Sequence, residues 1–170
     1  MLDTVKRYLQ NVGSELGRTA LNTILGSLAD RYSTQMLGSG GLVIKAGGSA
    51  VVKTGSAFYA LAQGFLVTKT ANTDMAALSG TVTNAKFNVF CFYIDSAGTL
   101  TSQMGTEGAT LAAVVMPTVP VGKAQIGFVV INPTGTGNFV GGTTPLDDAT
   151  VVPNAAYVNT VSVFDQTVLP

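Results

Sequence analysis

Histidine and tryptophan are both absent from this chain of 170 residues, and Cys91 is the single cysteine. Without histidine, Ser-His-Asp and Cys-His catalytic arrangements cannot form, and the commonest general base is missing. Zinc sites need several cysteines and histidines, so no such metal site is expected. One cysteine also excludes an intramolecular disulfide framework. We expect Cys91 to be buried and inert, because it lies in the most apolar run of the chain, residues 87–94, with no basic residue beside it.

Charge is also scarce. Nine basic and nine acidic residues give zero formal net charge, and charged residues make up 11% of the chain, against about 25% in an ordinary globular domain. A nucleic-acid partner is not expected, because such binding needs an excess of lysine and arginine. No apolar run approaches the 18 or so residues of a membrane helix, and the N-terminus lacks the apolar core of a secretory signal. We therefore expect neither a membrane nor a secretory route, and a protein made in a cytoplasm.

Residues 1–36 are predicted to form an N-terminal amphipathic helical arm. They carry 7 of the 18 charges and no proline. Apolar residues recur there at helical spacing, at Leu2, Val5, Leu9, Val12, Leu16, Leu21, Ile24, Leu25, Leu28 and Tyr32. Two interpretations stay open: the arm packs on its own sheet, or it docks on a partner or on copies of itself. The residues expected to form a partner or oligomer interface are Leu9, Val12, Leu16, Leu21, Ile24 and Leu28.

A glycine-rich stretch follows the arm, and residues 37–41 are predicted to be a linker. From residue 42 to 170 the pattern changes to short β-type runs separated by turn residues. Runs of this kind at regular spacing predict a mainly β domain, an antiparallel β-sandwich, a jelly-roll-like fold or a barrel. The aromatic residues inside these runs, among them Tyr59 and Phe65, are expected to pack in the core.

The β region holds only 11 charges in 134 residues. Natural sheets usually protect exposed edges with charge and proline, and this region has few such guards. We infer that much of its surface is covered in the working state, by copies of the chain or by a large assembly. The alternative is a monomer coated with threonine, serine and glycine. Runs that are apolar on both faces, such as residues 87–94, are expected to contact a second layer, the arm or another subunit.

Motifs for cofactors and catalysis are incomplete. Gly122-Lys123 lacks the upstream glycine of a phosphate-binding loop, and residues 135–140 lack the third glycine of a dinucleotide fingerprint. Asp147-Asp148 is the only acidic pair. It could contribute to a calcium site, but Pro145 and the residues around it favour a turn. We expect no catalytic residue, no cofactor and no metal.

Three segments of the β region resemble a β module of tailed-bacteriophage virion proteins, such as head decoration and head-fibre proteins. They are residues 92–100, 117–130 and 141–147. The resemblance covers about residues 45–165 and implies a non-enzymatic virion component, often a homotrimer, attached to a capsid lattice. It carries over no active-site residue.

The resulting expectation is a capsid decoration or cement protein that acts as a homo-oligomer, a trimer by the resemblance, on a phage head. Its partners would be copies of itself and the major capsid protein or another virion protein, and its location the phage particle. Other open interpretations are a tail, head-fibre or adaptor component, a receptor-binding or glycan-binding module, and an enzyme with carboxylates converging in a cleft.

Overall fold

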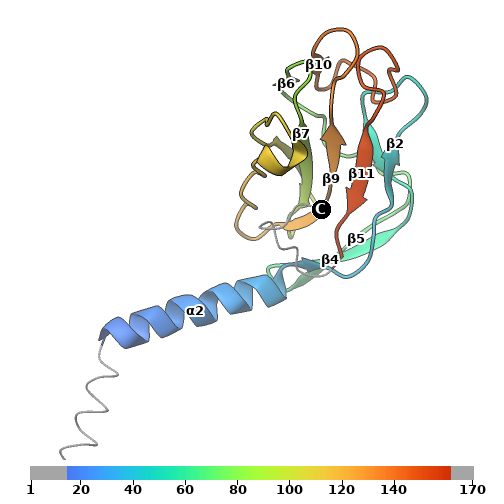
Figure 1. Ribbon diagram of the computed structural model, residues 1–170. Coiled ribbons are helices and arrows are strands. Elements are labelled where there is room, and N and C mark those ends of the chain that lie inside the picture. The colour runs from blue at the N-terminus through green and yellow to red at the C-terminus, as the bar shows by residue number, and fades with distance from the viewer. Residues whose placement is uncertain (1–14, 162–170) are drawn as a thin grey trace, which may run out of the picture. The chain divides into compact units, whose positions relative to one another are not determined.

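The computed structural model describes residues 15–161 (Figure 1). The chain divides into two compact units, residues 1–32 and 33–170. The described part consists of helix α2 (Glu15–Ser33), eleven strands that pair in antiparallel fashion, and one short 3-10 helix at Leu111–Ala113. It is therefore mainly β, as the sequence predicts.

Helix α2 covers the second half of the predicted arm. The apolar spacing favours a helix here although Gly26 lies in its interior, where glycine costs roughly 1 kcal/mol relative to alanine. A Cβ placed at Gly26 would meet nothing within 4 Å. No contact of the described chain therefore explains the glycine.

The largest sheet has four strands in the order β11-β9-β7-β8. It is built from β7 (Asn88–Ile94), β8 (Leu100–Met104), β9 (Ala124–Ile131) and β11 (Ala156–Asn159). A turn at residues 95–98 joins β7 to β8, with Ile94 opposite Leu100. The Asp95 carboxylate accepts hydrogen bonds from the main-chain N–H groups of Ala97 and Thr99, which closes this turn.

Three smaller sheets complete the second unit. Strand β4 (Phe58–Ala62) lies between β1 (Gln35–Met36) and β5 (Phe65–Lys69). Strand β2 (Leu42–Ile44) pairs with β3 (Val52–Thr54), and β6 (Thr81–Val82) pairs with β10 (Phe139–Val140). Residues 110–116 and 150–152 are also β-type runs in the sequence, but the first holds the 3-10 helix and the second a turn.

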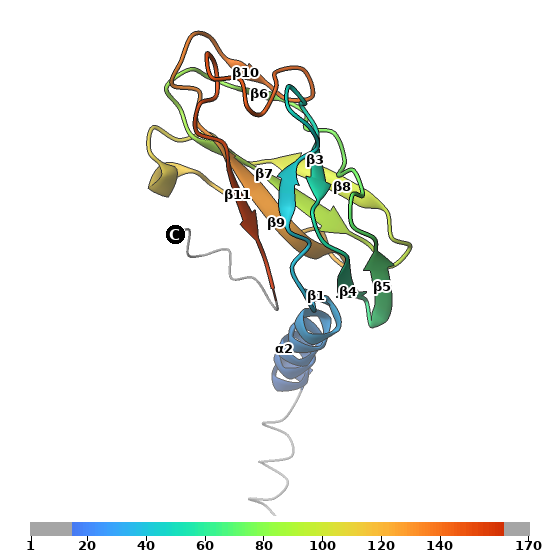
Figure 2. The same cartoon turned by 90° about the vertical axis from the view of Figure 1, so that its right-hand side faces the viewer.

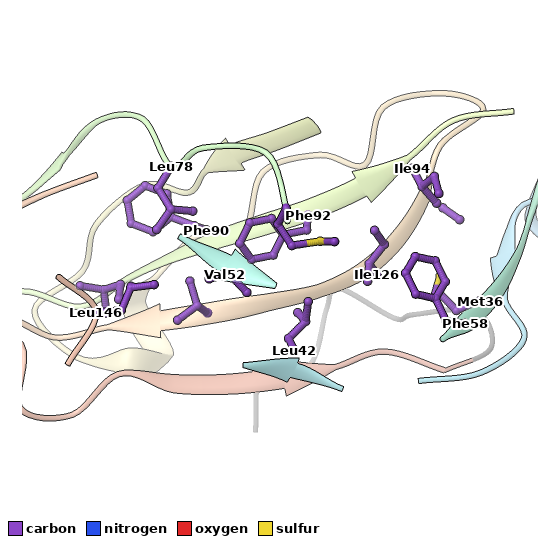
Figure 3. Packing of buried hydrophobic residues seen from close by; sticks show 14 of the residues in the cluster. Met36, Leu42, Val52, Phe58, Leu78, Phe90, Phe92, Ile94, Ile126 and Leu146 are labelled. Atoms are coloured by element: carbon purple, nitrogen blue, oxygen red, sulfur yellow. The ribbon is translucent and has the colours of Figure 1, made fainter. Parts of the chain in front are cut away.

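The main core lies where these sheets meet. Figure 3 shows side chains from β1, β2, β3 and β4 meeting those of β7 and β9. Phe90 of β7 and Phe139 of β10 pack edge to face, with ring centroids 5.8 Å apart. Aromatic pairs in this geometry add to the stabilisation that burial provides. The core therefore ties all four sheets together.

The second face of the large sheet is covered by the chain itself. Val89, Cys91 and Tyr93 of β7 form a separate buried cluster with Phe128 of β9 and with Val114. Leu111, Met116 and Val119 pack against it as well. Of the three covers expected for this face, the structure shows the second layer, which residues 111–119 form by folding back over it.

The glycine-rich stretch at residues 37–41 belongs to the second unit, and the division between the units lies at Tyr32/Ser33. Gln35 and Met36 already pair with β4, and the Gly41 carbonyl accepts a hydrogen bond from Gly55 N–H. A Cβ at Gly40 would lie 3.1 Å from Phe58 Cδ1. Glycine is needed here for close packing, whereas the composition suggests a flexible linker.

Candidate docking surfaces

Helix α2 carries an exposed apolar stripe. Leu21 and Leu25 are 54% and 53% exposed, and Tyr32 is 70% exposed. Leu21, Leu25 and Tyr32 are spaced by four and seven residues, which places side chains on one helical face, as in a coiled-coil seam. The stripe contains no charged residue. It is a surface that another apolar surface can cover.

The predicted interface residues have different outcomes. Leu16, Leu21, Ile24 and Leu28 lie on α2, and Leu21 is exposed; their role in an interface stays a prediction. Leu9 and Val12 lie outside the described residues. Leu25 and Tyr32 were not among the predicted interface residues, although both belong to the apolar periodicity. A heptad count from Leu21 could have identified them.

A second exposed apolar surface lies on the outer face of the β1–β4–β5 sheet. Leu61 of β4 pairs with Leu66 of β5, and Tyr59 pairs with Thr68. Leu66 and Tyr59 are 61% and 54% exposed. Successive strand residues alternate between faces, and the residues between these, Ala60 and Val67, are buried. We call the outer-face residues Tyr59, Leu61, Leu66 and Thr68 the outer sheet face.

Phe65 stands at the tip of the β4–β5 hairpin and is 66% exposed. Gln63 and Gly64 form the turn with positive φ at both residues, 53° and 80°, the conformation of a two-residue hairpin turn. A Cβ at Gly122 would lie 2.5 Å from the Gln63 amide nitrogen, so the turn that holds Val121 lies against this tip. Tyr59 and Phe65 therefore contradict the prediction that these aromatics pack in the core. Tyr59 lies on the outer face of the sheet, whereas Phe65 shares the face of buried Val67 but lies at the end of the hairpin.

Cys91 is buried, as predicted, in the cluster beneath residues 111–119. Burial raises the pKa of its thiol to about 12, and the hydrogen bond with Tyr93 offsets this in part. Burial also raises the pKa of the Tyr93 hydroxyl. A thiol with such a pKa is protonated near neutral pH and a weak nucleophile. The environment is that of a packed side chain.

The acidic pair Asp147-Asp148 acts locally. Both Asp147 carboxylate oxygens accept a hydrogen bond from Gly48 N–H, at 3.1 and 3.0 Å. Asp148 accepts from the N–H groups of Thr150 and Val151 and from the Thr150 hydroxyl, which lowers the pKa of the Asp148 carboxyl. The two carboxylates thus bind different segments, and residues 146–147 form a turn, as the sequence predicts. Among residues 15–161, no group of three or more acidic or cysteine side chains is placed to hold a metal ion.

Comparison with protein-family models, with curated proteins and with solved structures finds no match for this chain. Within the described part, no helix has both the length and the apolar character needed to cross a membrane.

Proposed function

We propose that the chain is a non-enzymatic structural protein of a tailed-phage particle, a decoration or cement protein that acts as a homo-oligomer on the head. The observation that carries this proposal is the pair of uncharged apolar surfaces, the α2 stripe and the outer sheet face. Exposed apolar patches of this kind mark interaction sites. The resemblance of the β segments to virion modules supplies the kind of particle.

Each of the two units would carry one of the two binding surfaces. The second unit, which we propose to be a sandwich-like body, would present the outer sheet face. The α2 stripe, with Leu21 and Leu25 at its centre, would bind the shell or bundle with other copies. A protein that binds only the assembled shell favours the assembled state. Several copies in one oligomer strengthen this binding by multivalency, and a trimer would match a threefold lattice position.

The test of this function is the copy number in particles. Particles released from cells that carry the gene would be purified on a density gradient, and the chain would be quantified against the most abundant shell protein. A decoration protein should be present in numbers comparable to the shell protein. A few copies per particle would instead indicate a tail, head-fibre or adaptor component. Absence of the chain from particles would overturn the proposal.

The contribution of the arm can be tested with charge. Leu21→Lys with Leu25→Lys should remove the chain from particles, because two charges would interrupt the apolar stripe. The matched control is Thr19→Lys with Thr23→Lys, which adds the same charge on the opposite side of α2, where both threonines are exposed. Equal incorporation of the two variants would show that the stripe is not the anchor.

A further inference from the structure

Strand β5 has an open main-chain edge. In the β4–β5 hairpin, residues 65, 67 and 69 pair with 62, 60 and 58 next to the two-residue turn, so their main-chain groups point toward β4. The Tyr59 carbonyl instead accepts from Leu37 N–H on the β1 side, which fixes the alternation. The N–H and C=O groups of Leu66 and Thr68 therefore point away from β4. Within residues 15–161 no hydrogen bond to these four groups is found.

Hydrogen bonds from other segments reach three further outer strands of the described part, two of them through side chains. The Ser102 hydroxyl of β8 donates to the carbonyl of Ala77, which runs beside that strand. The Asn159 side chain of β11 accepts from Leu42 N–H of β2. Beside β3, Met75 N–H donates to the Val52 carbonyl. Figure 2 shows β5 as the outermost strand of its sheet, without a further strand beyond it.

We propose that β5 pairs with β5 of a second copy of this chain, antiparallel and centred on Val67. The inference rests on the homo-oligomer of the proposed function and assigns one of its contacts. Leu66 would lie opposite Thr68 of the second copy, and Phe65 opposite its Lys69. An uncovered edge strand without proline or bulge is a template for such pairing.

This register pairs the outward main-chain groups of β5 and also keeps its charged residues apart. Because the edge-facing groups belong to Leu66 and Thr68, their two pairings across the two-fold axis form four hydrogen bonds and leave none of these groups unpaired. Lys69 is the only charged residue of β5. Centring on Val67 places Lys69 against the aromatic ring of Phe65, where a cation is attracted, and keeps the two lysines apart. A strand with more charges would repel its own copy.

The pairing also has a consequence for the outer sheet face. Two three-stranded sheets would become one six-stranded sheet, and the outer sheet faces of both copies would lie side by side. The contact is two-fold, so alone it makes a dimer. Combined with the trimer implied by the resemblance, it would join trimers and give an assembly of six. The mass of the purified oligomer in solution should correspond to two or six copies of the chain. A mass of three copies alone would overturn the pairing.

Cysteine cross-linking tests the register. Residues that face each other without hydrogen bonds in antiparallel pairs have Cα atoms about 4.5 Å apart, within reach of a disulfide. Val67→Cys should therefore form a cross-linked dimer under mild oxidation of the full chain. Tyr59→Cys is the control, because it is exposed on β4 but distant from the axis. The native Cys91 is buried and should not contribute. No dimer from Val67→Cys, or equal dimer from both variants, would overturn the register.

Proline tests the edge without breaking the fold. Thr68 N–H points outward, and proline is tolerated at such edge positions, so Thr68→Pro should keep the circular dichroism of the native chain. It removes one outward donor and should weaken self-association about tenfold or more in sedimentation. Thr68→Val, which keeps the donor, should associate like the native chain. Equal association of all three would overturn the pairing.

The two proposals fail separately. If the native chain enters particles but Thr68→Pro associates normally, the decoration function stands and the β5 contact is wrong. If Val67→Cys cross-links as expected but the chain is absent from particles, the contact stands and the function is wrong.

Discussion

Strands β5 and β7 are both apolar in sequence, and they lie in opposite environments. Every residue of β7 is buried, whereas Val67 is the only buried residue of β5. Strand β7 has a neighbour on each edge, the main core on one face and residues 111–119 on the other. Strand β5 has one neighbour and no described cover on its outer face. Apolar composition therefore selects a strand, but the surrounding chain decides whether the strand is buried.

The largest effect is expected in β7. Phe92→Ala removes a ring that is 1% exposed in the main core and should lower the free energy of unfolding by about 3–5 kcal/mol. Urea unfolding followed by circular dichroism measures this change. Phe92→Leu is the control, since it keeps most of the volume and should cost much less. A loss below about 1 kcal/mol for Phe92→Ala would mean that the core around β7 is looser than described.

The second face of β7 can be tested with alkaline pH. The pKa of the Cys91 thiol is raised from 9.0 to about 12 in the folded chain. Because the pKa is raised on folding, the protonated thiol contributes its full stabilisation of the folded chain below pH 9. This contribution is lost as the pH rises toward 12. Stability should therefore fall across this window, by a few kcal/mol on the order of the shift. Cys91→Ala should reduce the loss of unfolding free energy over this pH range, and the part that remains is due to Tyr93. Identical alkaline profiles would contradict the burial of this face.

Loosening the cover should expose the same thiol. Val114→Ala shortens a side chain that is 5% exposed above Cys91, and it should cost about 2 kcal/mol. Labelling of Cys91 by a thiol reagent at neutral pH should become faster than in the native chain. Val115→Ala is a matched control because Val115 is 62% exposed. Faster labelling of the control alone would contradict the assigned cover.

Local pattern was sufficient to predict much of the β unit. The β2–β3 and β7–β8 hairpins follow from β-type runs with turn residues between them, and α2 follows from the apolar spacing. For β4 and β5 the sequence indicates the two runs but not their pairing. The segment that covers each face of a strand was harder to predict. Residues 110–116 suggest a strand, yet they form a 3-10 turn whose side chains close the second face of β7. Only the tertiary arrangement makes that position favourable for them.

The candidate surfaces show the same limit. Periodicity placed Leu21 on an apolar helical face, but Phe65 and Tyr59 looked like core residues because single runs do not reveal how many neighbours a strand has. The main-chain edge at Leu66 and Thr68 could not be inferred from sequence at all. It depends on the alternation of hydrogen bonds that the Gln63-Gly64 turn sets.

A smaller effect is expected in the glycine-rich stretch. Gly40→Ala places a Cβ 3.1 Å from Phe58 Cδ1 and 3.5 Å from Ile126 Cγ2. The Phe58 ring must shift slightly, at a cost of roughly 1 kcal/mol. Gly38→Ala is the control, because a Cβ there meets nothing within 4 Å. If both glycines acted as a flexible linker, both variants would leave the thermal midpoint unchanged.

The smallest effect on the fold is expected in β5. Phe65→Ser alters a side chain that is two-thirds exposed, so at concentrations below self-association the free energy of unfolding should change by less than about 0.5 kcal/mol. Above that concentration the native chain gains stability from association, and the variant should gain less. A plot of thermal midpoint against protein concentration separates the stability of the single chain from the stability gained by association. Parallel plots would mean that Phe65 lies outside every contact. Converging plots at low concentration would mean that this phenylalanine stabilises the assembly and leaves the single chain unaffected, which is the reverse of Phe92.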